Sequence, residues 1–246
     1  MSSSSPTESS LHRGTWLSLG SPVIAELAAE SGFEWLLFDL EHGASTDAHL
    51  FGQLQAIKGT QSRAIVRFGE PHPDQVLRAL DWGAAGLMVP HVSSAAEARS
   101  VVESAYYPPK GKRGYSRSAR AYGYGLRVPA SAAEIPPPLI MAQIENIEGV
   151  ENATEIADVE GIDVLFVGPA DLQFDLVARP EKATLDFAGC LNAVAAAAKR
   201  AGKEAGILLR DVSEVEKYLA LGFTWLALDS DLAILRKGYQ GLMEKG

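Results

Sequence analysis

Residues 35–43 read WLLFDLEHG, and this stretch carries the pattern that decides the fold. The apolar residues at 35–38 predict a short buried strand, and Asp39, Glu41 and His42 follow directly. Ionisable groups are costly to bury, so a strand that ends in three of them must reach solvent or deliver them to a site. We interpret the stretch as a core strand whose carboxyl end lies at the rim of a pocket.

Seven further apolar or β-branched runs resemble this one along the chain. Together the eight runs lie at 15–20, 35–40, 64–68, 86–90, 139–145, 163–168, 204–209 and 223–229. Amphipathic stretches between them, several with Ser or Asp in front and Gly behind, predict helices. Strands that alternate with helices form a parallel sheet, because each helix is the crossover. Eight such units predict a single closed (β/α)₈ TIM barrel over residues 14–246, and a doubly wound open sheet is the alternative.

Composition narrows the class of partner. The 246 residues carry a formal net charge of −9, and the 22 Lys and Arg are scattered, which argues against a nucleic-acid partner and favours small-molecule chemistry.

Residues 1–13 contain no apolar leader, and no apolar run approaches the roughly 20 residues of a membrane span. We therefore expect a disordered tail at 1–13 on a cytoplasmic protein without a membrane partner. The lone Cys190, in a helical stretch, is expected to be a buried structural thiol.

One segment breaks the alternation. Residues 106–138, YYPPKGKRGYSRSARAYGYGLRVPASAAEIPPP, are far longer than the usual connection of about 2–6 residues. Loops of this length in compact domains are commonly lids or contact surfaces, and we expect one of these roles here.

The carboxyl ends of barrel strands hold the chemistry of this fold, so the residues at those positions are the candidates. Glu145 follows the fifth run and Asp171 the sixth, which places two carboxylates on neighbouring strands. Two close carboxylates repel unless a cation lies between them, and oxygen ligands favour Mg²⁺ or Mn²⁺. A general acid/base pair or two helix-capping acids are the alternatives.

Arg67 lies inside an apolar run, where an arginine is costly unless it is paired. Its planar fork suits a carboxylate or a developing oxyanion, and a structural ion pair with Asp39 or Asp81 is the alternative. His42 is a candidate proton carrier or a hydrogen-bonded rim residue. No lysine lies in any of the eight runs, so an imine-forming residue has no candidate, and the dinucleotide, Walker and serine-hydrolase motifs are absent.

Several motifs together resemble a known family. FDLEHG (38–43), PPKGKRG (108–114), QIEN (143–146) and VGPADL (167–172) occur in an order that is similar to the HpcH/HpaI aldolases, class II metal-dependent enzymes. The resemblance implies a (β/α)₈ barrel that uses Mg²⁺, Mn²⁺ or Co²⁺. An enzyme of this kind adds pyruvate or hydroxypyruvate reversibly to an aldehyde, and in the reverse direction it cleaves 4-hydroxy-2-oxo acids. It also implies a homohexamer, a trimer of dimers, whose final helix packs on a neighbouring subunit.

The resemblance assigns roles to matching positions. It implies metal ligands at Glu145 and Asp171, catalytic residues at His42, Arg67 and Asp81, and substrate contacts at Trp16, Gln143, Gly168, Pro169 and Ala170. In this assignment Asp81 orients His42, and the 168–170 backbone receives the substrate carboxylate. His91 and the stretch QFDLVARP (173–180) depart from the family pattern and leave the acceptor aldehyde open. A citramalyl-CoA-type carbon–carbon lyase and a non-catalytic 2-oxo-acid or metal-binding barrel are the alternatives.

Overall fold

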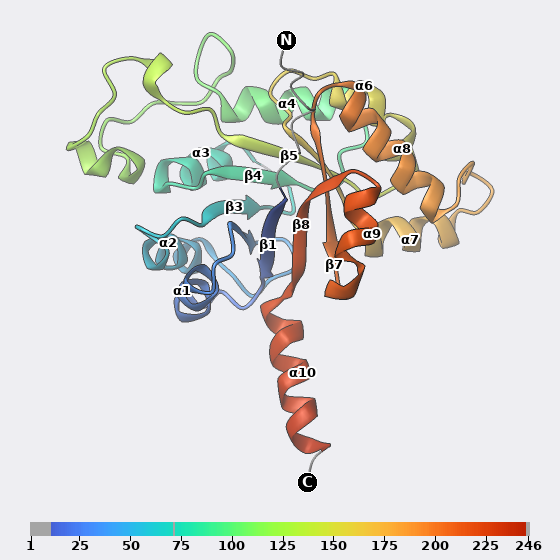
Figure 1. The fold of residues 1–246 in the computed structure, drawn as a ribbon. Helices are drawn as coiled ribbons and strands as arrows, with labels where there is room; N and C mark the ends of the chain where they lie inside the picture. Colours follow the sequence, from blue (N-terminus) through green and yellow to red (C-terminus); the bar gives the residue numbers. More distant parts are fainter. Residues whose placement is uncertain (1–10, 71, 245–246) are drawn as a thin grey trace, which may run out of the picture.

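The strands of the protein close into a barrel in chain order. The structure is a computed structural model that describes residues 11–70 and 72–244 (Figure 1). The strands are β1 (His12–Leu17), β2 (Trp35–Asp39), β3 (Arg63–Arg67), β4 (Gly86–Val89), β5 (Leu139–Ile144), β6 (Val164–Val167), β7 (Glu204–Leu209) and β8 (Phe223–Ser230). Each pairs in parallel with the next, and β8 pairs with β1. The predicted (β/α)₈ barrel is confirmed, because an open sheet would leave two strands with one free edge each.

The helices lie around the barrel, except for the last, which projects from it. They are α1 (Pro22–Glu30), α2 (Asp47–Ala56), α3 (Pro73–Trp82), α4 (Ala95–Ala105), α5 (Ile147–Glu151), α6 (Ala153–Ala157), α7 (Pro169–Ala178), α8 (Phe187–Arg200), α9 (Val215–Ala220) and α10 (Asp231–Met243). Several begin at the Ser or Asp that the sequence predicts: Ser21, Ser94 and Asp186 accept hydrogen bonds from backbone N–H groups in the first turn. Asn146, which was not predicted, caps α5 in the same way.

Large apolar side chains fill the barrel, so it is a packed core and not a channel. Trp16, Trp35, Met88, Phe166 and Trp225 are among those that meet inside. A second apolar layer, which includes the buried Cys190, lies between the strands and the helices. The interior packing leaves the polar chemistry to the two ends of the barrel.

The first strand differs from the sequence-based boundary. β1 begins at His12, so His12 and Arg13 belong to the sheet, whereas the sequence places them in the tail. Their pairing with Trp225 and Leu226 of β8 explains this, because ladder partners on a distant strand are invisible to a local pattern. Residues 1–10 of the predicted tail lie outside the described residues.

The segment 106–138 lies at the amino-terminal ends of the strands. It leaves the end of α4 and enters β5, and it contains two short 3₁₀ turns, Arg120–Gly125 (η1) and Ala132–Glu134 (η2). Arg120 donates to the carbonyl oxygens of Trp82 and Leu54, and the Tyr107 and Tyr122 hydroxyls are 2.9 Å apart. Because helix-to-strand connections lie opposite the carboxyl ends, this segment is not a lid over the catalytic end of its own barrel.

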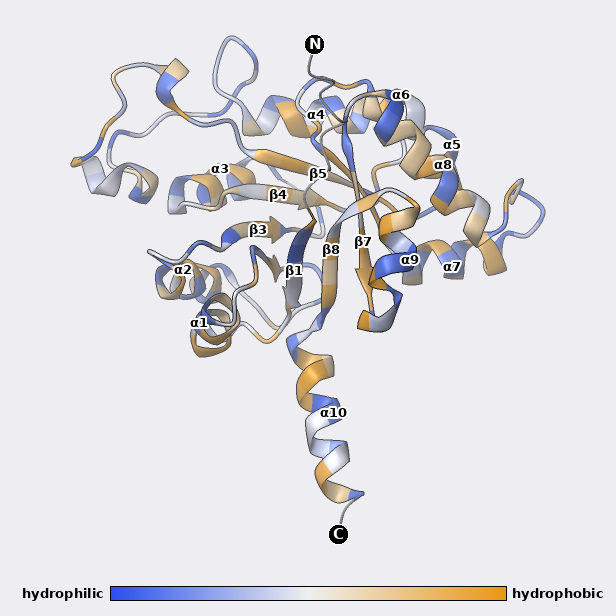
Figure 2. Cartoon of the chain, in the orientation of Figure 1, coloured by the Kyte–Doolittle hydropathy of each residue, from blue (hydrophilic) through white to orange (hydrophobic). Residues whose placement is uncertain are grey.

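Helix α10 projects away from the barrel, as Figure 1 shows. Its apolar residues form bands along the helix in Figure 2, and Leu232, Ile234, Tyr239, Leu242 and Met243 are exposed. Within the described residues, no helix has the length and hydropathy that crossing a bilayer requires.

Candidate active site

The carboxyl ends of the strands surround a cavity of about 540 Å³. Eight of the predicted site residues line it: Trp16, His42, Arg67, Gln143, Gly168, Pro169, Ala170 and Asp171. A ninth, Glu145, contacts Gln143 at the cavity wall. The tenth, Asp81, does not line the cavity. The fold therefore brings together, from β1, β2, β3, β5 and β6, side chains that are up to 155 positions apart in the chain, from Trp16 to Asp171.

Arg67 at the end of β3 is buried between two acids. Its Nε and Nη2 donate to Asp39 Oδ1 and Oδ2 at 3.0 and 2.8 Å, and its Nη1 lies 2.9 Å from Glu41 Oε2. The indole of Trp16 lies 4.8 Å from the guanidinium and donates to Asp39 at 3.2 Å. The ion pair with Asp39 that the sequence left as an alternative is present, and it holds the guanidinium rigidly at the cavity wall.

Asp39 is charged in this arrangement. Burial acts to raise the pKa of its carboxyl, but the hydrogen bonds and positive charge of Arg67 outweigh burial, and the net pKa is lowered. The backbone N–H groups of Glu41 and His42 also donate to Asp39 Oδ1. One carboxylate therefore fixes both Arg67 and the turn that carries His42.

Glu145 at the end of β5 is a buried carboxylate without a cationic ion pair to a Lys or Arg among the described residues. Its Oε1 accepts from the His91 backbone N–H at 2.7 Å, and its Oε2 accepts from Gln143. Burial, with smaller contributions from the nearby charges of Asp171 and Glu41, raises the pKa of Glu145 to about 7 against the lowering effect of His91. A divalent cation bound at such a carboxylate would relieve the repulsion between it and its acidic neighbours.

The backbone at 167–171 leaves space next to this carboxylate. Gly168 caps α7, and a Cβ added at Gly168 would collide with Glu145 Oε2 and Gln143 Nε2. Asp171 lies in the first turn of α7 and opens to the cavity. The chain thus fits a metal with two carboxylate ligands, Glu145 and Asp171, and with the remaining positions for small-molecule oxygens. Across residues 11–70 and 72–244, no set of three His, Cys, Asp or Glu side chains is arranged to hold an ion.

His91 was not assigned a role from the sequence, and it lies directly against the proposed metal ligand. Its Nδ1 is 3.0 Å from Glu145 Oε1, and its Nε2 is 3.4 Å from Glu41 Oε1. Its φ of 54° is the left-handed conformation that few residues other than glycine adopt. That turn directs both the ring and the backbone N–H toward Glu145, and no signal in the local sequence predicts it.

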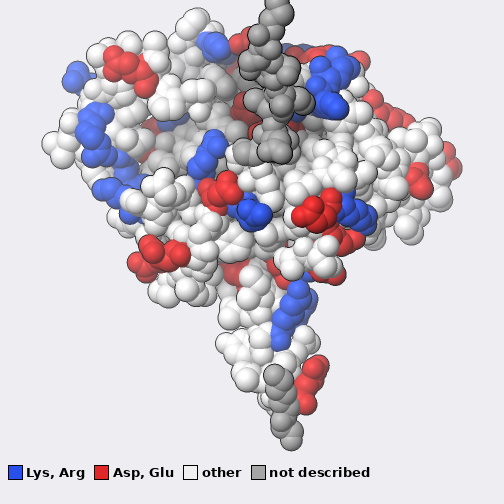
Figure 3. Space-filling model, in the orientation of Figure 1, with Lys and Arg blue, Asp and Glu red and all other residues white. Residues whose placement is uncertain are grey.

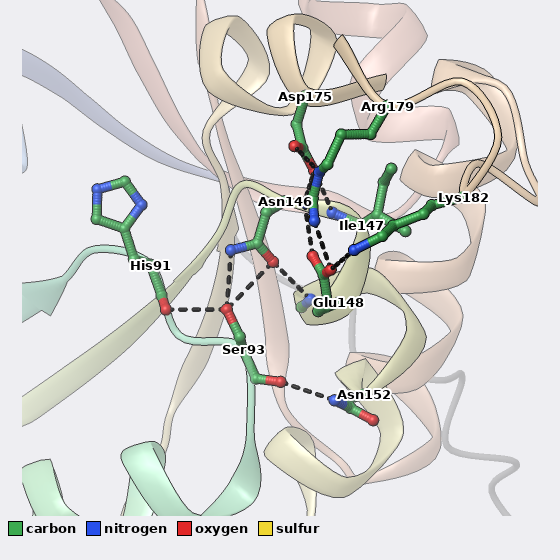
Figure 4. Close-up of polar contacts among 10 residues, drawn as sticks. His91, Ser93, Asn146, Ile147, Glu148, Asn152, Asp175, Arg179 and Lys182 are labelled. Carbon is green, nitrogen blue, oxygen red and sulfur yellow. Dashed lines mark hydrogen bonds and ion pairs between the residues drawn. The ribbon is translucent and has the colours of Figure 1, made fainter. Parts of the chain in front are cut away.

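The loops behind the two carboxylates are tied together, as Figure 4 shows. Asn146 exchanges hydrogen bonds with Ser93 and so joins the β5–α5 and β4–α4 loops. Arg179 donates to Glu148 on α5 and to Asp175 on α7, with distances of 2.5 to 2.7 Å. Asp175 also accepts from the Ile147 backbone N–H. These contacts hold the helix that carries Asp171 against the loop that follows Glu145 (Figure 4).

His42 and Asp81 are not brought together by one chain. The His42 side chain is 70% exposed at the rim, and its Nε2 is 3.7 Å from Glu41 Oε1. Asp81 lies in the last turn of α3, next to the start of β4, and its Oδ1 accepts from Arg113 at 2.7 Å. Since α3 ends at the opposite face from the carboxyl end of β2, Asp81 does not orient His42 within the subunit.

The cavity also holds residues that sequence reasoning missed. Arg210 directly follows β7 and donates to Asp229 and Ser230 at 3.1 Å, and Phe187, Glu214 and Tyr218 line the same side. An arginine immediately after an apolar run is the same signal that identified ionisable residues after β2, and it could have identified Arg210.

Comparisons with known proteins find relatives that match nearly the whole chain. The family model described as HpcH/HpaI aldolase/citrate lyase matches residues 12–237. A 5-keto-4-deoxy-D-glucarate aldolase of Klebsiella pneumoniae is 36% identical over 232 residues, covering 94% of this chain and 90% of that protein. A hydroxypyruvate/pyruvate aldolase of Paraburkholderia phytofirmans is 37% identical over 241 residues, covering 94% and 92%. The crystal structure of an HpcH/HpaI aldolase from Desulfitobacterium hafniense superposes with a TM-score of 0.87 at 30% identity, covering 96% and 93%.

Proposed function

The chain belongs to the HpcH/HpaI aldolase/citrate lyase family and is a carbon–carbon lyase of the aldolase type, and from this premise we propose its reaction. We propose that it catalyses the reversible, metal-dependent addition of pyruvate or hydroxypyruvate to an aldehyde, and so cleaves 4-hydroxy-2-oxo acids. The observation that carries the proposal is the buried carboxylate of Glu145, with a pKa near 7, beside Gly168 on the wall of the cavity that Arg67 and Asp171 line.

Glu145 and Asp171 would hold the divalent ion, Mg²⁺, Mn²⁺ or Co²⁺. When bound, that ion supplies positive charge to the carboxylate and keto oxygens of the 2-oxo acid. Gly168, Pro169 and Ala170 lie at the amino end of α7. The N–H of Gly168 donates to the Ile144 carbonyl and Pro169 has no N–H, so the backbone N–H of Ala170 is the one of the three that would favour an anion such as the substrate carboxylate. Gln143 and Trp16 complete this side of the cavity.

Arg67 would stabilise negative charge on the keto oxygen. Its pairing with Asp39 and Glu41 fixes its position before substrate binds, so little reorganisation is needed during the reaction. In the cleavage direction His42, directly or through a water, removes the proton of the 4-hydroxyl. The C3–C4 bond then breaks and the aldehyde leaves. The electron pair of the broken bond remains on the 2-oxo-acid fragment, which takes up a proton at C3.

Removal of the metal tests this reaction. Dialysis against a chelator should abolish cleavage of a 4-hydroxy-2-oxo acid, and Mg²⁺, Mn²⁺ or Co²⁺ should restore it. Glu145→Gln should fail to recover with any of these ions, whereas Glu151→Gln, a matched change on the next helix, should recover fully. Full activity in excess chelator would overturn the metal-dependent mechanism. Exchange of the pyruvate methyl protons in deuterated water separates an enzyme from an inert binder, which shows none.

We also propose that the chain assembles with copies of itself, as a hexamer built from dimers. Helix α10 supports this, because Leu232, Ile234, Tyr239, Leu242 and Met243 are exposed on a helix that leaves the barrel. Apolar side chains in such number on one projecting helix are typical of an interaction surface.

A further inference from the structure

A second pocket lies at the end of the barrel opposite the catalytic cavity. Its lining includes Arg63 at the start of β3, Ala85 immediately before β4, and Pro138 immediately before β5. The volume of about 540 Å³ lies within the range of small-molecule sites. The wall on the outer side comes from the segment 106–138, which the proposed reaction does not use. This pocket is therefore separate from Glu145, Asp171 and Arg67.

The charge of this pocket is one-sided. Three arginines line it, Arg63, Arg113 and Arg127, and no Asp or Glu does, although the whole chain has a net charge of −9. In Figure 3 basic side chains gather on the left of the view, over the segment 106–138. Asp81 neutralises Arg113, so Arg63 and Arg127 supply the net positive charge around this hollow. A local positive potential of this kind attracts and retains anions.

The three guanidinium groups keep unused hydrogen-bonding capacity. Arg127 and Arg63 form no ion pair within the described part of the chain; Arg63 instead stacks 5.4 Å from the Trp225 ring. The Arg113 side chain is 6% exposed and is bound to Asp81 through Nη2. Its buried Nε has no hydrogen-bond partner. An unsatisfied buried donor is costly, and guanidinium groups pair well with phosphate and carboxylate.

The rest of the lining is apolar and stiff. Pro129, Ile135, Pro136, Pro137 and Pro138 line the same pocket as the arginines. Proline fixes its own φ, so this wall loses little entropy when a ligand binds. Such a wall suits the apolar body of a small molecule whose charged groups reach the arginines.

We propose that this pocket binds a small organic anion that carries phosphate or carboxylate groups. The anion would pair with Arg63 and Arg127 and satisfy the orphan donor of Arg113. The site is distinct from substrate binding, and it couples the segment 106–138 to the amino-terminal ends of β3, β4 and β5.

Calorimetric titration of the full chain in chelator, without 2-oxo acid or aldehyde, tests the site apart from catalysis. Inorganic pyrophosphate serves as the phosphate probe and malonate as the carboxylate probe, at low salt. We expect saturable binding of at least one probe, and the tighter one identifies the anion chemistry. Arg127→Gln and Arg63→Gln should each weaken binding about tenfold or more, because charge-assisted hydrogen bonds are lost.

Arg117→Gln is the matched control, because Arg117 is exposed on the same segment and does not line the pocket. It should leave the affinity unchanged. An equal loss in Arg117→Gln would show diffuse surface attraction and would overturn the proposal, as would the absence of saturable binding by both probes. Because no metal or substrate is present, failure here leaves the proposed aldolase reaction untouched. Conversely, absence of aldolase activity would leave the result on anion binding at this pocket unchanged.

Discussion

Arg67 and Asp39 face each other across neighbouring strands and form a two-point ion pair at the wall of the candidate active-site cavity. The two residues are register partners in the β2–β3 ladder, and their hydrogen bonds measure 3.0 and 2.8 Å. Their burial makes the pair rigid, and the same pair reaches Trp16 on one side and Glu41 on the other. A single contact thus serves both the stability of the barrel and the placement of its cationic group.

Arg67→Ala should lower the rate of cleavage by about 10²-fold or more, because a positioned donor to a developing oxyanion is lost. It should also lower the free energy of unfolding by about 3–5 kcal/mol, since Asp39 and Glu41 would remain buried without their cation. Steady-state kinetics and urea denaturation measure the two effects. Arg67→Lys keeps the charge and should lose less stability. A rate loss below tenfold in Arg67→Ala would assign Arg67 a structural role only.

The pH dependence of stability should report the Asp39–Arg67 pair. The pKa of Asp39 is lowered in the folded protein from 3.8, so the charged pair contributes its full stability above pH 3.8. That contribution is lost as the pH falls through the lowered pKa. The difference in unfolding free energy between wild type and Asp39→Asn should therefore stay constant from pH 7 to about pH 5 and shrink toward pH 3. Denaturation at several pH values measures it, and a difference that grows on acidification would contradict the prediction.

Arg179→Gln should weaken metal binding without removing a ligand. The change breaks the link between Glu148 and Asp175, which holds α7 and Asp171 against the loop after Glu145. Loss of such supporting contacts typically costs about 10–100-fold in metal affinity. Mn²⁺ titration followed by electron paramagnetic resonance measures this, and kcat at saturating metal should change little. Lys182→Gln is the control, because Lys182 reaches the same Glu148 only at 3.4 Å from an exposed position. Equal effects of the two changes would refute the positioning role.

His42→Ala should separate two steps of the reaction. Proton transfer at the 4-hydroxyl is lost, so cleavage should fall by about 10²–10⁴-fold. Exchange of the pyruvate methyl protons, which does not involve that hydroxyl, should fall much less, as NMR in deuterated water would show. Added imidazole should restore part of the cleavage activity. Parallel loss of cleavage and exchange would argue that His42 acts on the donor and not on the hydroxyl.

Charges placed at exposed apolar positions of α10 should disrupt assembly. Ile234→Glu together with Leu242→Glu puts two carboxylates on positions that are exposed in the single chain and that we expect to be covered in the oligomer. Light scattering should report a smaller mass, whereas the circular dichroism of the barrel should be unchanged. Gln240→Glu adds one carboxylate at a polar position of the same helix and should assemble normally. An unchanged mass in the double variant would rule out α10 as the contact.

The order of elements could be predicted from sequence because the information is local. Eight apolar runs lie within three residues of the eight strands, since each run carries its own alternation of core and turn residues. Residues at the ends of those runs, including Arg67, Gln143 and Asp171, line one cavity because parallel strands share a carboxyl end. A local pattern and one rule of the fold were enough for these positions.

Other features depend on which distant segments of the chain come into contact. Only the tertiary structure decided those features. Barrel closure places Asp81 beside Arg113 and away from His42, turns His91 against Glu145, and gathers three arginines at the far end. Helix α10 carries an ordinary amphipathic pattern, yet it leaves the barrel. The sequence by itself determined which groups stand at strand ends, because spacing along one strand sets that. The partners of those groups required the folded chain, because contacts between remote segments have no signature in the spacing of either one.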